Sequence, residues 1–148
     1  MTTAPSTSAM NISELLQELV YRVEDLQLLQ ITDNNGAVVA KGCIEELEGN
    51  TDDVETSRMS FALQQASKIS LGECSSVISY FENCVLMHMK SFDNQLILTC
   101  VALKNVNMAL MFEMEPKLKR VLDTVAKKIN EFKTQKQQNA VTSTEETN

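Results

Sequence analysis

Residues 75–103 read SSVISYFENCVLMHMKSFDNQLILTCVAL and are the most informative stretch of this chain. Valine, isoleucine, leucine and aromatic residues form three runs, which are separated by the polar pair Glu82–Asn83 and by Phe92–Gln95. Runs of this length and composition between polar turns are typical of β-strands. The stretch therefore predicts three consecutive strands, at 75–81, 84–91 and 96–103. The last is apolar almost throughout, as in a strand that is buried on both faces.

A hairpin is predicted upstream of this stretch. Residues 25–32 and 37–41 are rich in apolar side chains, and they flank the tetrapeptide Asp33-Asn-Asn-Gly36. An Asn-Gly pair supplies the positive φ angles that a tight turn between antiparallel strands needs. The two regions together give five strands.

Three amphipathic helices complete the pattern. The first begins at the capping sequence Asn11–Glu14 and carries apolar residues at helical spacing up to Val23. The second is expected from about Val54 to Ser70, with its end near Gly72. The third runs from Pro116 through Phe132. The order α-β-β-α-β-β-β-α predicts an α+β fold (an α/β sandwich), with a five-stranded, mostly antiparallel sheet and helices on both faces.

The chain has the length of one domain, and its two ends differ from its middle. Its 148 residues are 43% hydrophobic and 22% charged, which is ordinary for a globular protein. Both ends are rich in threonine, serine, glutamine and asparagine, and such segments cannot offset their ordering entropy by burial. We therefore expect disordered tails at residues 1–10 and 134–148 and one folded domain at 11–133.

Charge and cysteine content disfavour several kinds of partner. The 13 basic and 20 acidic residues leave a formal net charge of -7, so neither nucleic acid nor anionic lipid is expected as a direct partner. An acidic loop at residues 44–55 accounts for most of this charge. The 4 cysteines form no C-x-x-C pair and the chain has 1 histidine, which predicts free thiols and no zinc site. No signal peptide, lipid-anchor motif or membrane insertion is expected, so any membrane address would come from a partner.

The sequence contains no motif of a catalytic or cofactor-binding site. General-base catalysis by the single histidine, His88, would need a nucleophile and an orienting group, and no G-x-S-x-G motif supplies them. The phosphate-binding patterns G-x-x-x-x-G-K-[ST] and G-x-G-x-x-G are also missing. We therefore expect no enzymatic activity, no catalytic residue, no cofactor, no metal, and a structural role for His88.

Surface is the remaining source of function. Val77, Ile78, Tyr80 and Phe81 give the strand at 75–81 more large apolar side chains than a half-exposed hairpin needs. An edge strand with unpaired backbone groups is a template for another chain. Pairing with a second copy or with a partner, which would extend the sheet, is therefore the expected function. The alternative is a monomer whose own loops cover this edge.

Two segments resemble a known family. They are Ser60–Gly72, which reads SFALQQASKISLG, and Ser76–Phe81, which reads SVISYF. With the element order, they resemble the roadblock/LC7 domain, and within that family the mitogen-activated protein kinase scaffold subunits of Ragulator complexes. The resemblance runs from roughly Leu15 to Val125, and it departs from the family in the longer acidic loop after Cys43 and in both tails.

The resemblance implies a non-enzymatic adaptor that pairs with a second roadblock subunit. In this family a lipidated anchor subunit wraps the heterodimer on the cytoplasmic face of late endosomes and lysosomes. There the complex supports Rag GTPase docking, activation of TORC1 by amino acids and signalling by MAP kinase pathway kinases. The implied pairing surface lies on the second helix and the third strand, at Phe61, Gln64, Gln65, Lys68, Val77, Ile78, Ser79 and Tyr80.

Two other functions remain open at the level of sequence. One is a homodimeric roadblock protein that serves a motor or a polarity GTPase. The other is a small-molecule sensor, because a sheet flanked by helices can enclose a pocket. The sequence offers no convergent set of polar residues for such a ligand.

Overall fold

The strands and helices are defined in a computed structural model, which describes residues 11–45, 63 and 65–145. In chain order they are α1 (Ile12–Arg22), β1 (Leu26–Asp33), β2 (Val38–Cys43), β3 (Val77–Tyr80), β4 (Cys84–Lys90), β5 (Leu96–Leu103) and α3 (Met108–Glu145). Between β2 and β3, residues 63 and 65–67 are helical, and most of the helix predicted there lies outside the described residues. The predicted order of elements is confirmed.

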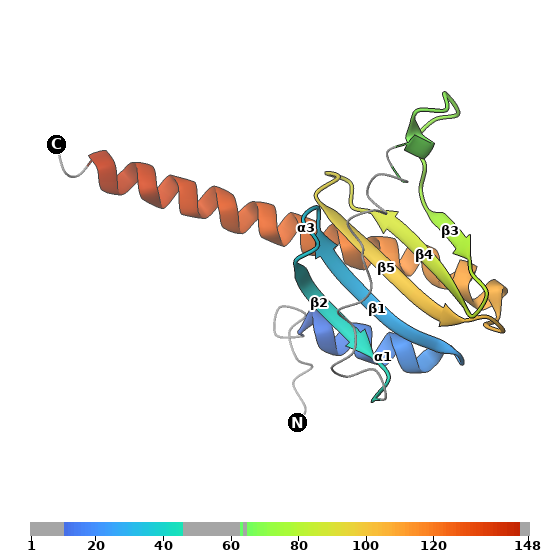
Figure 1. Ribbon diagram of the computed structural model, residues 1–148. Coiled ribbons are helices and arrows are strands. Elements are labelled where there is room, and N and C mark those ends of the chain that lie inside the picture. The colour runs from blue at the N-terminus through green and yellow to red at the C-terminus, as the bar shows by residue number, and fades with distance from the viewer. Residues whose placement is uncertain (1–10, 46–62, 64, 146–148) are drawn as a thin grey trace.

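One five-stranded sheet forms the centre of the molecule, in the order β2-β1-β5-β4-β3 (Figure 1). Every pair of neighbouring strands is antiparallel, as predicted. β5 lies between β1 and β4, and all of its residues except Val101 and Leu103 are buried. This explains the almost continuous apolar run that the sequence shows there. β2 and β3 form the two edges.

α1 and α3 cover the same face of the sheet (Figure 1). The main core cluster joins their buried side chains to alternate residues of the strands, among them Leu19, Leu29, Met87, Leu98 and Leu122. Because side chains alternate along a strand, the residues next to these, such as Gln30, His88 and Thr99, point to the opposite face. Leu63, in the segment predicted to form the second helix, is fully buried and is not part of this core cluster.

α1 lies close against β2. Asn11 caps the helix, because its side-chain oxygen accepts a hydrogen bond from the backbone N–H of Ser13 at 3.1 Å. A Cβ atom at position 42 would lie 2.4 Å from the backbone nitrogen of Gln17, so the glycine in β2 is required for this approach. The side chains of α1 can therefore reach the backbone of β2.

α3 begins earlier than the sequence predicts. The predicted start was Pro116, but the helix begins at Met108 and the proline lies inside it. The side chain of Asn107 accepts a hydrogen bond from the backbone N–H of Ala109 at 3.0 Å and so caps the helix. The added turns also bury Met111 in the core. The cap at Asn107 and the burial of Met111 thus let the helix begin before Pro116.

α3 also ends later than predicted. It continues to Glu145, so the tail expected to be disordered from residue 134 is helical over 134–145. Residues 130–140 are exposed, and the helix runs out beyond the sheet (Figure 1). Neither this helix nor α1 is both long and apolar enough to cross a membrane. The predicted tail at residues 1–10 lies outside the described residues.

Candidate partner interface

β3 forms an open edge of the sheet. On one side it pairs with β4, with Val77 opposite His88 and Tyr80 opposite Val85. Within the described part of the chain no strand lies on its other side (Figure 1). The four strand residues of the predicted pairing surface, Val77, Ile78, Ser79 and Tyr80, therefore lie together at this edge.

The backbone of β3 presents alternate residues to the open edge. The N–H of Phe81 donates to the carbonyl of Cys84 at 2.9 Å, so these two residues are a hydrogen-bonded pair. Hydrogen-bonded and non-hydrogen-bonded pairs alternate along an antiparallel ladder. The N–H and C=O groups of Ile78 and Tyr80 consequently point away from β4, in the direction from which a further strand would approach.

The side chains of β3 divide between the two faces of the sheet. Ile78 and Tyr80 lie on the face that α1 and α3 cover. Ile78 packs against the core cluster, whereas Tyr80 is 69% exposed. Val77 and Ser79 are half-buried on the opposite face. The strand thus combines a residue anchored in the core with an exposed aromatic ring, a side chain that often dominates binding energy at protein interfaces.

The helical part of the predicted pairing surface is only partly described. Phe61 and Gln64 lie outside the described residues. Gln65 and Lys68 are not buried, and the N–H of Lys68 donates to the carbonyl of Gln65 where the helical segment ends. Figure 1 shows this short segment beyond the start of β3. The structure places these two residues on the chain that leads into the strand.

Two exposed apolar residues follow this segment, and the sequence did not indicate them as surface. Ile69 is 63% exposed and Leu71 is 88% exposed. The helical pattern places Ile69 on the apolar stripe of the second helix, but the described helical residues end at Ser67 and Ser70 has a φ of 64°. The helix therefore ends before the predicted stop near Gly72. No sequence pattern predicts that Ser70 adopts a positive φ, so the early end of the helix could not be foreseen.

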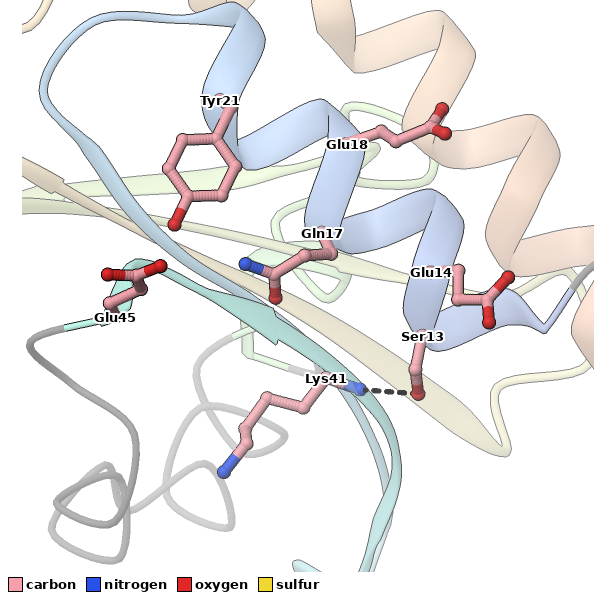
Figure 2. Close-up of a pocket in the computed structure, with 7 residues that line it drawn as sticks. All are labelled: Ser13, Glu14, Gln17, Glu18, Tyr21, Lys41 and Glu45. Carbon is pink, nitrogen blue, oxygen red and sulfur yellow. Dashed lines mark hydrogen bonds between the residues drawn. The ribbon is translucent and has the colours of Figure 1, made fainter.

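The edge at β2 is closed by side chains of α1. The amide of Gln17 accepts a hydrogen bond from the N–H of Cys43 at 3.0 Å and donates one to the carbonyl of the same residue. The hydroxyl of Ser13 accepts a hydrogen bond from the N–H of Lys41 at 3.4 Å (Figure 2). Because Lys41 and Cys43 are alternate residues, both direct their backbone groups away from β1. The two sheet edges therefore differ. Side chains of α1 bind backbone groups of β2, whereas no strand lies beside β3 within the described residues.

An open hollow of about 740 Å³ lies beside this closed edge (Figure 2). Its lining includes Glu14, Glu18, Tyr21, Lys41 and Glu45. In Figure 2, Glu14 and Glu18 point away from Tyr21 and Glu45, so the carboxylates do not converge on one point. Across the described residues there is also no group of three or more His, Cys, Asp or Glu side chains that could hold a metal ion. The hollow does not form a convergent ligand site.

Two residues with catalytic chemistry, His88 and Cys100, are buried. The Nδ1 atom of His88 lies 3.1 Å from the Oγ1 atom of Thr99, and burial lowers the pKa of the imidazole to about 4. Burial raises the pKa of the Cys100 thiol to about 12. A neutral imidazole that is 1% exposed cannot reach a substrate, and a protonated thiol is a poor nucleophile. Both residues contribute to packing, the structural role expected for His88.

Comparisons with known proteins were made by sequence and by structure. The profile of the family described as "Mitogen-activated protein kinase kinase 1 interacting" matches residues 10–129. A direct comparison with curated protein sequences finds no match. The description of this family names an interaction with another protein.

Solved structures share the fold at low sequence identity. MglB from Myxococcus xanthus has a TM-score of 0.60 and 14% identity, covering 84% of this chain and 99% of that one. The gliding protein MglB from Thermus thermophilus has a TM-score of 0.61 and 12% identity, covering 85% and 99%. A roadblock/LC7 domain from Streptomyces avermitilis has a TM-score of 0.54 and 13% identity, covering 84% and 99%. The chain thus has the roadblock/LC7 fold and belongs to the mitogen-activated protein kinase kinase 1 interacting family.

Proposed function

We propose that this protein is a non-enzymatic scaffold subunit that pairs with a second roadblock subunit through the edge of β3. The difference between the two sheet edges carries the proposal. Side chains of α1 bind the outward backbone groups of β2, whereas Ile78 and Tyr80 direct theirs out of the sheet at β3. A partner strand placed there would continue the sheet and bury the exposed ring of Tyr80.

The family supplies the proposed partners. Its description names mitogen-activated protein kinase kinase 1, so we propose that the pair presents a surface to kinases of this pathway. We place the pair in a Ragulator-like complex, held by a lipidated anchor subunit on the cytoplasmic face of late endosomes and lysosomes. There it would support Rag GTPase docking and TORC1 activation by amino acids. The formal charge of -7 favours recruitment through a partner over direct binding to anionic lipid.

Affinity capture of the full chain from a cell lysate, with mass spectrometry of stoichiometric partners, tests this assignment. Recovery of a second roadblock subunit together with a lipidated anchor would support it. Recovery of the bait alone, or of motor subunits, would contradict it.

Self-pairing is the alternative, and the mass of the purified chain distinguishes the two. A solved structure titled "MglB with tetrameric arrangement" has the same fold at 14% identity. Self-assembly is therefore the alternative that we test. If the chain pairs with a different subunit, light scattering of the purified chain alone should give the mass of one chain. A stable dimer would favour a homodimeric roadblock protein instead.

Replacing Tyr80 with proline tests whether the partner pairs with the backbone of β3. The N–H of Tyr80 points away from β4, so proline removes a donor toward the partner and leaves the β3–β4 ladder in place. The matched variant Tyr80→Ala removes the same ring but keeps the donor. In titration calorimetry with the captured partner, we expect Tyr80→Pro to weaken pairing about tenfold more than Tyr80→Ala. Equal losses in the two variants, with unchanged circular dichroism, would contradict pairing at this edge.

A further inference from the structure

An apolar groove lies at the base of the α3 overhang. It has a volume of about 440 Å³ and is formed by the start of α1, the start of β2 and one side of α3. Its apolar lining consists of Ile12, Val39, Val125, Ile129 and Phe132. Val125 is buried, whereas the ring of Phe132 is 66% exposed. The groove is at the β2 side of the sheet, away from the β3 edge (Figure 1).

Lysines of α3 lie along one side of this groove. Lys128, Lys133 and Lys136 line it, and all three are exposed. No acidic side chain is among its lining residues. The ion pair between Lys119 and Asp123, earlier on α3, involves none of the three. A protein with a formal charge of -7 therefore carries a local row of positive charges beside exposed apolar surface.

The proposed pairing function does not account for this groove. The family match ends at residue 129, and Phe132, Lys133 and Lys136 lie beyond it. Phe132 is 66% exposed and is not part of the main core cluster, so core packing does not explain it. An apolar surface of this kind, rimmed by polar groups, is typical of an interaction site.

We propose that the groove docks an acidic amphipathic helix of a partner protein. Large apolar side chains of that helix, at a spacing of three and four residues, would cover Ile129 and Phe132. Its aspartates and glutamates would lie against the three lysines, which explains a row of charges of one sign. Residues 130–145 of α3 provide a ledge of about 24 Å along which such a helix can lie. The concave shape of the groove favours a helix over a flat membrane surface.

A designed peptide tests the proposal with the full-length chain. The probe is a synthetic amphipathic helix of about five turns, with leucine on one face and glutamate beside it. A matched peptide carries lysine in place of every glutamate. By titration calorimetry, we expect the glutamate peptide to bind and the lysine peptide to bind at least about tenfold more weakly. Comparable affinity for the two peptides, or no binding of either, would overturn the proposal.

Variants of the groove locate the binding site. Phe132→Ala and Lys136→Glu should each weaken binding of the glutamate peptide at least about fivefold. Both side chains are exposed, so the fold should persist. Lys117→Glu, an equal charge change at an exposed position nearer the start of α3 and outside the groove, should leave affinity unchanged. A loss that is equal in Lys117→Glu and Lys136→Glu would show a general charge effect and overturn the site.

Lipid vesicles test whether the groove binds a membrane instead of a helix. If phosphatidylserine vesicles bind the chain through Lys136 and the glutamate peptide does not, the surface contacts membrane and the peptide proposal is wrong. Phe132 and Lys136 line the groove beside β2, which is the edge strand opposite β3. Loss of peptide binding with intact subunit pairing would therefore confirm the groove independently of the proposed function.

Discussion

At the level of single residues, His88 shows how burial decides a chemical role. It lies on the sheet face opposite α1 and α3, in a row across the strands with Gln30 and Thr99. Thr99 is its hydrogen-bond partner, and its Nε2 atom has no partner within the described residues. Charging this imidazole would be costly, because burial removes it from water and so disfavours its protonated form.

Protonation of His88 should destabilise the protein at mildly acidic pH. The imidazole binds a proton near pH 6.5 in the unfolded chain but only at about 4 in the folded protein, because burial lowers its pKa. Between these values the unfolded state binds more protons, so stability rises with pH. The free energy of unfolding therefore has its full value above pH 6.5. It decreases by up to about 3 kcal/mol as the pH falls to 4. Urea unfolding at a series of pH values measures this slope.

The variant His88→Gln is the control for that prediction. Glutamine keeps a polar side chain in the row but does not titrate. The change in the free energy of unfolding between pH 6.5 and pH 4 should therefore shrink in the variant. The same slope in both proteins would mean that another group is responsible.

At the level of elements, side chains of α1 bind backbone groups at the edge of β2, whereas those of β3 stay open within the described residues. The amide of Gln17 binds both backbone groups of Cys43, which faces away from β1. We expect Gln17→Ala to leave these groups unpaired and to lower the free energy of unfolding by about 1–3 kcal/mol. It should also allow association that grows with concentration, since an open edge pairs with other chains. Urea unfolding and light scattering measure the two effects.

Glu18→Ala serves as the matched variant, because Glu18 is the next residue on α1 and is exposed. It should change neither stability nor mass by a measurable amount. If Gln17→Ala behaves in the same way as Glu18→Ala, the bonds to Cys43 do not protect this edge.

The strands could be predicted closely because local features define them. The strand at 96–103 has its predicted bounds, and the one at 84–90 ends a single residue early. Polar turn residues end each run, and they are visible in the sequence. The start of α3 was wrong because two local signals compete there: the cap at Asn107 begins the helix, while Pro116 suggested a later start.

The open edge at β3 was harder to predict because it depends on contacts between distant residues. The apolar pattern of Val77–Tyr80 indicated a strand with surface to cover. Its place at the edge, however, follows from β5 pairing with both β1 and β4, which no local pattern encodes. The bond between Gln17 and Cys43 joins residues 26 positions apart and has no sequence signal. Sequence patterns therefore indicated the elements, and nonlocal pairing determined which edge stays open.

At the level of the whole molecule, two surfaces lie at different ends of the sheet. β3 directs backbone groups out of the sheet, and the groove beside Phe132 combines an apolar lining with three lysines of α3. β1, β5 and β4 separate the two edge strands, so partners at the two sites would not compete for space. If both proposals hold, the sheet would keep the two partners at a fixed separation, as a scaffold requires.

A chain that ends at Lys133 tests whether folding is independent of peptide binding at the groove. Residues 134–140 of α3 are exposed, so their removal together with the rest of the chain should change the free energy of unfolding by less than about 0.5 kcal/mol. Subunit pairing should also persist, because β3 is untouched. Binding of the acidic peptide should weaken at least about fivefold, since Lys136 and the outer ledge are lost. Urea unfolding, light scattering and calorimetry on the same preparation measure all three quantities. A large loss of stability would contradict this division, because it would mean that residues after 133 pack on the domain and that the overhang is part of the fold.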